Sequence, residues 1–120
     1  MEKFKKKILV VDDDEMLLMA TKELLTAEGY DVATHVSGFG VINRITTSRP
    51  DIVLLDINMP ALSGDNLAKL VLQRCDVPIV FHSSNDEDSL RRAVAECRVK
   101  GYICKGDIFD LKRKVATYLL

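Results

Sequence analysis

The chain has 120 residues, of which 48% are hydrophobic, so we expect one domain with its own apolar core. A formal net charge of −1 and an isoelectric point of about 6.1 exclude the strongly basic surface that direct nucleic-acid binding requires. The lysines Lys3, Lys5, Lys6 and Lys7 precede an apolar run of only four residues, which excludes a signal peptide and a membrane span.

The first segments alternate between strand and helix patterns. Ile8–Val11 is apolar throughout, which predicts a strand covered on both faces, as in a parallel sheet. Leucines at helical spacing between Leu17 and Leu25 predict a helix that Gly29 ends. Polar and apolar residues alternate from Val32 to Val36, so we expect this second strand at an edge of the sheet.

The middle of the chain repeats this order. Apolar residues from Val41 to Ile45 predict a second helix. Ile52–Leu55 is the third predicted strand and, like the first, is apolar throughout. Leu67, Leu70 and Val71 are spaced as the buried stripe of a third helix.

The last third adds two strands and two helices. Ile79–Phe81 is an apolar strand, and Ser84 with Glu87 has the spacing of a capping box at a helix start. The stripe from Leu90 to Cys97 belongs to this helix, which we expect Gly101 to end. Tyr102–Cys104 is the last strand, and a stripe of Leu111, Val115 and Tyr118 marks the last helix.

Five strands alternating with five helices predict an α/β fold, a three-layer sandwich around a five-stranded parallel sheet. Right-handed crossovers favour the strand order 2-1-3-4-5 of the flavodoxin-like fold. Such a fold binds ligands beyond the carboxyl ends of the strands, near the switch point between the first and third strands.

The cysteines Cys75, Cys97 and Cys104 are an odd number without close pairing. Zinc sites need cysteines clustered with histidines, and His35 and His82 do not cluster with them. We therefore expect reduced, buried thiols and a cytoplasmic protein.

Polar residues lie at the carboxyl ends of four of the predicted strands. They are, in chain order, Asp12 and Asp13, Asp56, Ser83 and Lys105. Three carboxylates at one crevice repel each other unless a cation intervenes, and oxygen ligands without histidine or thiolate favour Mg²⁺. With a lysine charge and a serine hydroxyl, the set predicts phosphoryl transfer to a carboxylate, a reaction that depends on positioning and charge neutralisation.

Each of these residues also has an ordinary structural explanation. Asp12–Asp14 would suit a strand-to-helix turn with an N-cap, and Asp56–Pro60 a turn before a helix. Ser83 would suit a hydroxyl bonded to backbone, and Lys105 a solvated surface lysine. Four such coincidences around one crevice are less expected than one shared site.

The chain resembles the receiver domains of two-component response regulators over essentially its full length, residues 1–120. The matching stretches are Ile8–Asp14, Leu54–Pro60, Pro78–Ser84 and Gly101–Lys105. The resemblance implies a phosphoryl-accepting signalling switch, not an enzyme beyond its own phosphorylation and dephosphorylation. A sensor histidine kinase or phosphotransfer protein would supply the phosphoryl group. A partner or an output domain would read the result, without direct nucleic-acid or membrane binding.

The resemblance implies a role for each matching position. Asp56 would accept the phosphoryl group, Ser83 would hydrogen-bond it, and Lys105 would pair with it. The implied Mg²⁺ ligands are Asp12, Asp13, Asp56 and the backbone carbonyl of Asn58.

The resemblance also implies how phosphorylation changes the protein. Ser83 would move toward the phosphate, and Tyr102 would turn inward behind it. Asn58 and Asn85 match positions that tune the dephosphorylation rate. The surface read by a partner would comprise the fourth helix, the fifth strand and the fifth helix, because an added charge biases a two-state element.

The chain departs from the family pattern around two of these residues. His82 stands where an apolar residue is usual, and we predict a hydrogen-bonded neutral histidine in a buried strand. Ser83 replaces the commoner threonine. Gly106 follows Lys105 where the family usually has proline, often after a cis bond. Because a cis bond before a non-proline residue costs about 2.5–4 kcal/mol, we predict a trans Lys105–Gly106 bond in a mobile loop.

Three other functions fit parts of the pattern. A Mg²⁺-dependent phosphatase of the haloacid dehalogenase type has an aspartate pair spaced like Asp12 and Asp14, but such chains are larger and have a cap. A flavodoxin-like cofactor binder would need a phosphate loop rich in Ser, Thr and Gly after the first strand. A pseudo-receiver acting only as a binding module is disfavoured by the complete acidic and lysine positions.

Overall fold

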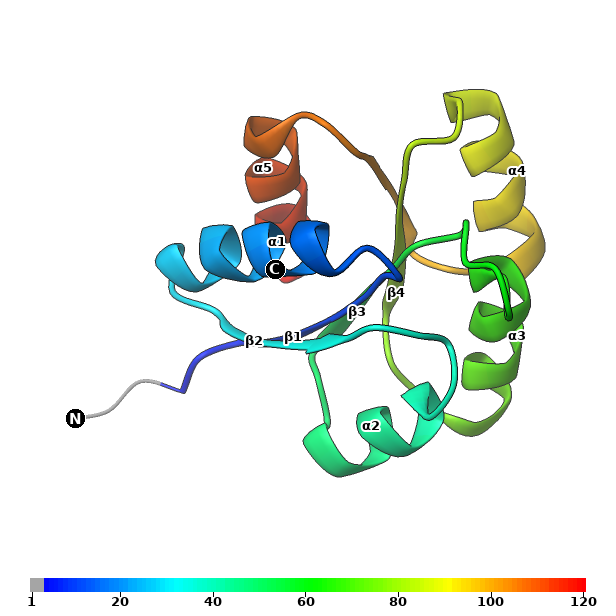
Figure 1. Ribbon diagram of the computed structural model, residues 1–120, viewed down its shortest axis with the longest axis horizontal. Coiled ribbons are helices and arrows are strands. Elements are labelled where there is room, and N and C mark those ends of the chain that lie inside the picture. The colour runs from blue at the N-terminus through cyan, green and yellow to red at the C-terminus, as the bar shows by residue number, and fades with distance from the viewer. Residues whose placement is uncertain (1–3) are drawn as a thin grey trace.

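Five strands and five helices alternate along residues 4–120, the part of the chain that the computed structural model describes (Figure 1). Residues 1–3, including Lys3 of the predicted cationic start, lie outside it. The strands are β1 (Lys7–Val11), β2 (Asp31–His35), β3 (Ile52–Leu55), β4 (Ile79–Ser83) and β5 (Gly101–Cys104). The helices are α1 (Glu15–Ala27), α2 (Val41–Ser48), α3 (Gly64–Arg74), α4 (Glu87–Cys97) and α5 (Ile108–Tyr118).

The strands pair in parallel in the order β2-β1-β3-β4-β5. Figure 1 shows α1 and α5 on one face of this sheet and α2, α3 and α4 on the other. The predicted three-layer α/β sandwich, its strand order and the edge position of β2 are therefore confirmed. The switch point lies between β1 and β3, where the two halves of the sheet meet.

Both faces of β1 and β3 are buried from Ile8 to Val11 and from Ile52 to Leu55, which explains why these stretches contain no polar residue. Leu9 and Val53 pack in the cluster that includes residues of α2, α3 and α4, whereas Ile8 and Leu54 pack on the face covered by α1 and α5. Because successive side chains of a strand point to opposite faces, a stretch that is covered on both faces needs apolar residues at successive positions.

The helix ends agree with the prediction at α1 but not at α4. Gly29 has φ +97 just beyond α1, and its N–H donates to the Thr26 carbonyl, as expected of a glycine that ends a helix. The predicted capping box at Ser84 is wrong. Asp86 caps α4 by accepting a hydrogen bond from the Ser89 N–H at 2.9 Å, because β4 extends to Ser83 and the helix begins later.

Two further predictions of helix structure need correction. Gly101 does not end α4; Arg98 caps the helix with φ +59, and Gly101 begins β5. A Cβ at Gly101 would overlap the Tyr118 hydroxyl, so close packing explains this glycine. Leu70 is 44% exposed, and the buried stripe of α3 instead includes Ala68.

The cysteines are free thiols, as predicted, but they are not all buried. Cys97 is buried in the core, whereas Cys75 and Cys104 are each partly exposed. Cys104 is on β5, the edge strand opposite β2, where one face is less covered.

The loop after β5 has the predicted trans peptide at Lys105–Gly106. Gly106 adopts φ +107, a left-handed conformation that glycine allows and other residues rarely adopt. A proline ring holds φ near −65°, so the family's usual proline would not fit this loop as it stands. The mobility expected for the loop stays a prediction.

Candidate functional site

Three carboxylates meet at the carboxyl ends of β1 and β3. These strands are neighbours with Val11 opposite Leu55, so Asp12 and Asp56 leave the sheet at the same level. One carboxylate oxygen from each of Asp12, Asp13 and Asp56 lies within 4.8 Å of the others. Asp12 and Asp56 are 2% and 3% exposed, whereas Asp13 is open to solvent. The predicted acidic cluster therefore forms, with one solvent-facing member.

Lys105 supplies a positive charge to two of these carboxylates. Its N–H donates to the Ser83 carbonyl at 2.9 Å, which fixes the start of the loop after β5. Its Nζ lies 2.8 Å from Asp12 Oδ2 and 3.4 Å from Asp56 Oδ2. Burial alone would lower the pKa of Lys105, but the hydrogen bond and charge of Asp12, together with Asp56, raise it. The side chain therefore stays protonated and neutralises part of the cluster.

Backbone groups orient the two buried carboxylates. The Asp14 N–H donates to Asp12 Oδ1 at 3.0 Å, and the Asn58 N–H donates to Asp56 Oδ1 at 3.2 Å. Burial raises the pKa of Asp56; the Asn58 N–H opposes this rise, and the Asp12 charge adds to it. Asp56 is thus a crowded, desolvated carboxylate whose environment favours a nearby cation.

A small polar network joins the ends of β3 and β4 beside Asp56. The Asn58 Nδ2 donates to Asn85 Oδ1 at 2.7 Å and lies 3.4 Å from Ser83 Oγ. The Asn85 N–H donates to Ser83 Oγ at 3.2 Å. Sequence reasoning named all three residues but did not foresee these contacts, because they depend on loop conformation. Ser83 is fully buried, and Asn58 links its hydroxyl to Asp56, because the Asn58 N–H also donates to the Asp56 carboxylate.

Gly64, the first residue of α3, is a site residue to which sequence reasoning assigned no role. Its N–H donates to the Ile57 carbonyl at 2.8 Å, and a Cβ at this position would overlap the Asp56 carbonyl oxygen. The start of α3 therefore packs directly on the backbone that presents the Asp56 carboxylate. The one signal in the sequence was a glycine opening a helix, where it is unfavourable unless close packing requires it.

Tyr102 lies apart from the carboxylates, on the edge strand β5. It is half-buried against the cluster that includes α4 residues, and Lys114 Nζ lies 5.3 Å from its ring centroid. The contact with Lys114 is a cation–π interaction between β5 and α5. The predicted inward turn of this ring stays a prediction.

His82 precedes Ser83 on β4 and is only 5% exposed. Burial lowers the pKa of His82 from 6.5 to about 4; the Lys105 charge lowers it further, and Asp12 opposes the shift. The neutral state predicted for this buried histidine is therefore supported. The predicted hydrogen bond is not found among the side-chain hydrogen bonds of residues 4–120. Because no enclosed polar atom in this part lacks a partner, the ring nitrogens must reach open space.

We predict that His82 makes the folded state sensitive to acid. The pKa of His82 is 6.5 in the unfolded chain and about 4 in the folded chain, so the unfolded chain binds a proton first as the pH falls. The unfolding free energy is therefore highest above pH 6.5 and decreases as the pH drops toward 4. Between pH 7 and 5 the His82→Leu variant should lose about 2 kcal/mol less unfolding free energy than wild type. Urea denaturation of both proteins at several pH values measures this, and parallel pH profiles would contradict it.

Residues 8–116 match the sequence model of a family described as the response regulator receiver domain. The transcriptional regulatory protein PrrA of Mycobacterium tuberculosis is 36% identical over 100 residues, covering 82% of this chain and 43% of that protein. A protein-glutamate methylesterase/protein-glutamine glutaminase of Archaeoglobus fulgidus is 31% identical over 94 residues, covering 78% of this chain and 27% of that protein.

A solved structure gives the same result. The BeF3-activated N-terminal receiver domain of Klebsiella pneumoniae RstA has a TM-score of 0.87 at 27% identity, covering 95% of this chain and 98% of that chain. The receiver structure is matched almost completely, whereas this chain spans less than half the length of the two relatives above.

Proposed function

The chain belongs to the response regulator receiver family, and we propose on this premise that Asp56 is the residue that accepts the phosphoryl group. The observation that supports Asp56 most is the difference between the two buried carboxylates. Asp12 is held on both oxygens, by the Asp14 N–H and by Lys105 at 2.8 Å. Asp56 is held more loosely, by the Asn58 N–H and by Lys105 at 3.4 Å. Asp56 Oδ2 therefore has more freedom to attack a phosphorus atom.

The proposed reaction moves one phosphoryl group. An Asp56 carboxylate oxygen attacks phosphorus, a new oxygen–phosphorus bond forms, and the nitrogen–phosphorus bond of a phosphohistidine breaks. The leaving imidazole takes up a proton from water. The Asp56 side chain gains negative charge, which Lys105 would pair with and the Ser83 hydroxyl would hydrogen-bond. Incorporation of phosphoryl groups from acetyl phosphate, and its loss in Asp56→Asn, tests this assignment.

The acidic cluster fits a Mg²⁺ ion. Oxygen donors from three aspartates within 4.8 Å of one another are the donor type that this ion prefers. We propose that Asp12, Asp13, Asp56 and the backbone carbonyl of Asn58 hold it. When bound, Mg²⁺ would offset the charge of the phosphoryl oxygens during transfer.

We predict that Asp13→Ala weakens Mg²⁺ binding on the order of tenfold or more, because it removes a carboxylate ligand. Without divalent ions the same change should not lower the unfolding free energy, and should raise it slightly, because it relieves repulsion among the acids. Isothermal titration and urea denaturation measure the two effects. Glu23→Gln, which removes an exposed charge from the middle of α1 and keeps the helix propensity, should change neither. A clear loss of stability in Asp13→Ala would count against carboxylate repulsion.

The donor and the readout follow from the same premise. We propose that a sensor histidine kinase or phosphotransfer protein supplies the phosphoryl group in the cytoplasm. Ser83 and Tyr102 would then change the surface of α4, β5 and α5. No described helix in residues 4–120 is long and apolar enough to cross a membrane. A partner or an output domain would read this surface.

The phosphatase alternative is weakened by the use of Asp14. Its Oδ1 accepts a hydrogen bond from the Leu17 N–H at 3.1 Å as the cap of α1, so this carboxylate serves the helix. The pseudo-receiver alternative predicts no phosphoryl incorporation at all, and the same labelling experiment distinguishes it.

A further inference from the structure

A cavity of about 180 Å³ lies between α1, the end of β4 and the start of α5. It is lined by Leu17, Ala20, Thr21, Leu24, His82, Gly106, Asp107, Ile108 and Leu111. Most of these side chains are apolar. The cavity contains none of the acidic cluster, and it is separate from the proposed phosphorylation site.

Two polar side chains in this wall are almost fully buried. Thr21 is 3% exposed and His82 is 5% exposed. Neither side chain takes part in the side-chain hydrogen bonds of the described chain, although Thr46 and Thr117 bond to the preceding helical turn. Both residues line the cavity, and because no fully enclosed polar atom in residues 4–120 lacks a partner, their unbonded polar atoms are open to it. The cavity therefore offers a ligand two hydrogen-bonding side chains that no protein atom occupies.

We propose that this cavity binds a small neutral molecule with one apolar ring and one hydroxyl group, which hydrogen-bonds to His82 and Thr21. A cavity of 150 Å³ with apolar walls is large enough for benzene, so one substituted ring fits the volume here. A single water would occupy only about 30 Å³ and would leave the apolar walls uncovered.

The charges around the cavity favour a neutral ligand. His82 is neutral at pH 7 because burial lowers its pKa to about 4, so the ring offers one donor and one acceptor. Asp107 is the one charged residue in the wall, and its Oδ1 already accepts the N–H groups of Phe109 and Asp110 as the cap of α5. The one charge of the wall is therefore negative and held at the exposed start of α5, which disfavours an anionic ligand.

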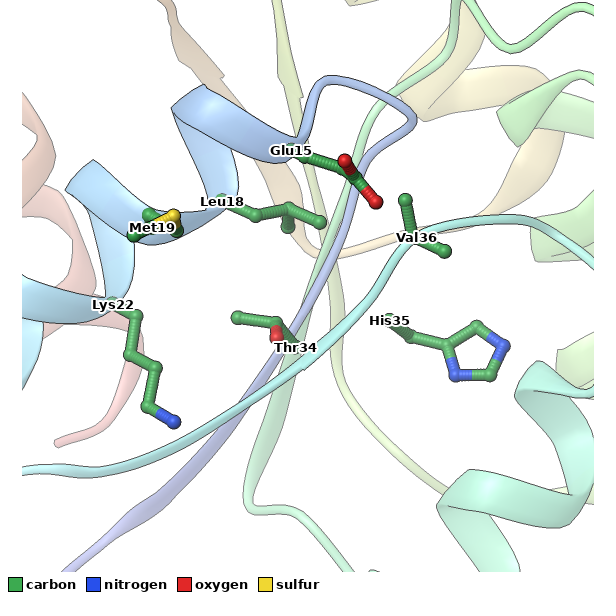
Figure 2. Close-up of a pocket in the computed structure, with 7 residues that line it drawn as sticks. All are labelled: Glu15, Leu18, Met19, Lys22, Thr34, His35 and Val36. Carbon is green, nitrogen blue, oxygen red and sulfur yellow. The ribbon is translucent and has the colours of Figure 1, made fainter.

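A larger hollow of about 620 Å³ lies between α1 and β2, and its lining residues are more exposed (Figure 2). Glu15 and Lys22 lie along it, and Met19 is 65% exposed. His35, although in its wall, points toward α2, where Nε2 lies 2.6 Å from the Phe39 carbonyl oxygen. None of the polar residues that line this hollow is buried, in contrast to Thr21 and His82.

The proposal is tested by titrating the full, unphosphorylated chain with phenol and with toluene, followed by amide and side-chain NMR. Phenol should cause saturable shifts at Thr21, His82 and Gly106, and it should bind on the order of tenfold more tightly than toluene. Thr21→Val and His82→Leu should remove most of this difference. Thr34→Val, the same change in the open hollow, should keep it.

Several results would overturn the proposal: no saturable shifts with phenol, equal binding of phenol and toluene, or variants that bind phenol like wild type. The phenol and toluene comparison needs only the wild-type chain, so the test remains valid if a variant does not fold. The titration contains no phosphoryl donor and no Mg²⁺, so a negative result would not bear on the proposed role of Asp56.

Discussion

Asp56→Asn should abolish phosphoryl incorporation from acetyl phosphate and Mg²⁺, whereas wild-type protein should take up one group per chain. The asparagine keeps the size of the side chain but removes the carboxylate nucleophile. It also removes one of three crowded charges, so the variant should fold at least as stably as wild type. Intact-protein mass spectrometry measures incorporation, and hydroxylamine should release the group because an acyl phosphate is labile to it.

The controls for this experiment separate the three possible functions. Asp31→Asn removes an exposed aspartate on β2, outside the cluster, and should leave incorporation unchanged. Label at Asp12 in the Asp56→Asn variant would favour the phosphatase alternative. An unlabelled wild-type protein would favour the pseudo-receiver alternative.

The fold could be predicted because strands that are buried on both faces of a parallel sheet appear in the sequence as short, continuous apolar runs. Ile52–Leu55 was predicted to the residue, since every side chain of β3 is buried. The start of α4 was predicted wrongly because Ser84 and Asp86 are both good capping residues. The choice between them depends on the loop that brings Asn85 to Asn58, a contact between residues far apart in the chain.

The candidate site could likewise be predicted only in part. The carboxyl ends of the predicted strands were sufficient to place Asp12, Asp56 and Lys105 at one crevice, without knowledge of any loop. The sequence could not show that Lys105 lies closer to Asp12 than to Asp56, since side-chain geometry decides it. The cavity beside His82 was also out of reach, because its walls come from three separate elements.

Gly64→Ala should destabilise the protein by about 2–3 kcal/mol and slow phosphorylation by at least on the order of tenfold. The added methyl group would overlap the Asp56 carbonyl oxygen and the adjoining backbone, which cannot move aside as a flexible side chain would. Alanine is the better helix residue by about 1 kcal/mol, so the overlap must exceed this gain before any loss is seen. Urea denaturation and the rate of acetyl phosphate incorporation measure the two effects.

Gly29→Ala provides the matched control for this substitution. Gly29 has open space around its missing Cβ but φ +97, so alanine there should cost about 1–2 kcal/mol through backbone strain alone. Because Gly29 follows α1 at the amino end of the sheet, its substitution should leave the phosphorylation rate unchanged. If Gly64→Ala lowered stability but kept the wild-type rate, the start of α3 would not position Asp56, and its contact with that backbone would serve packing only.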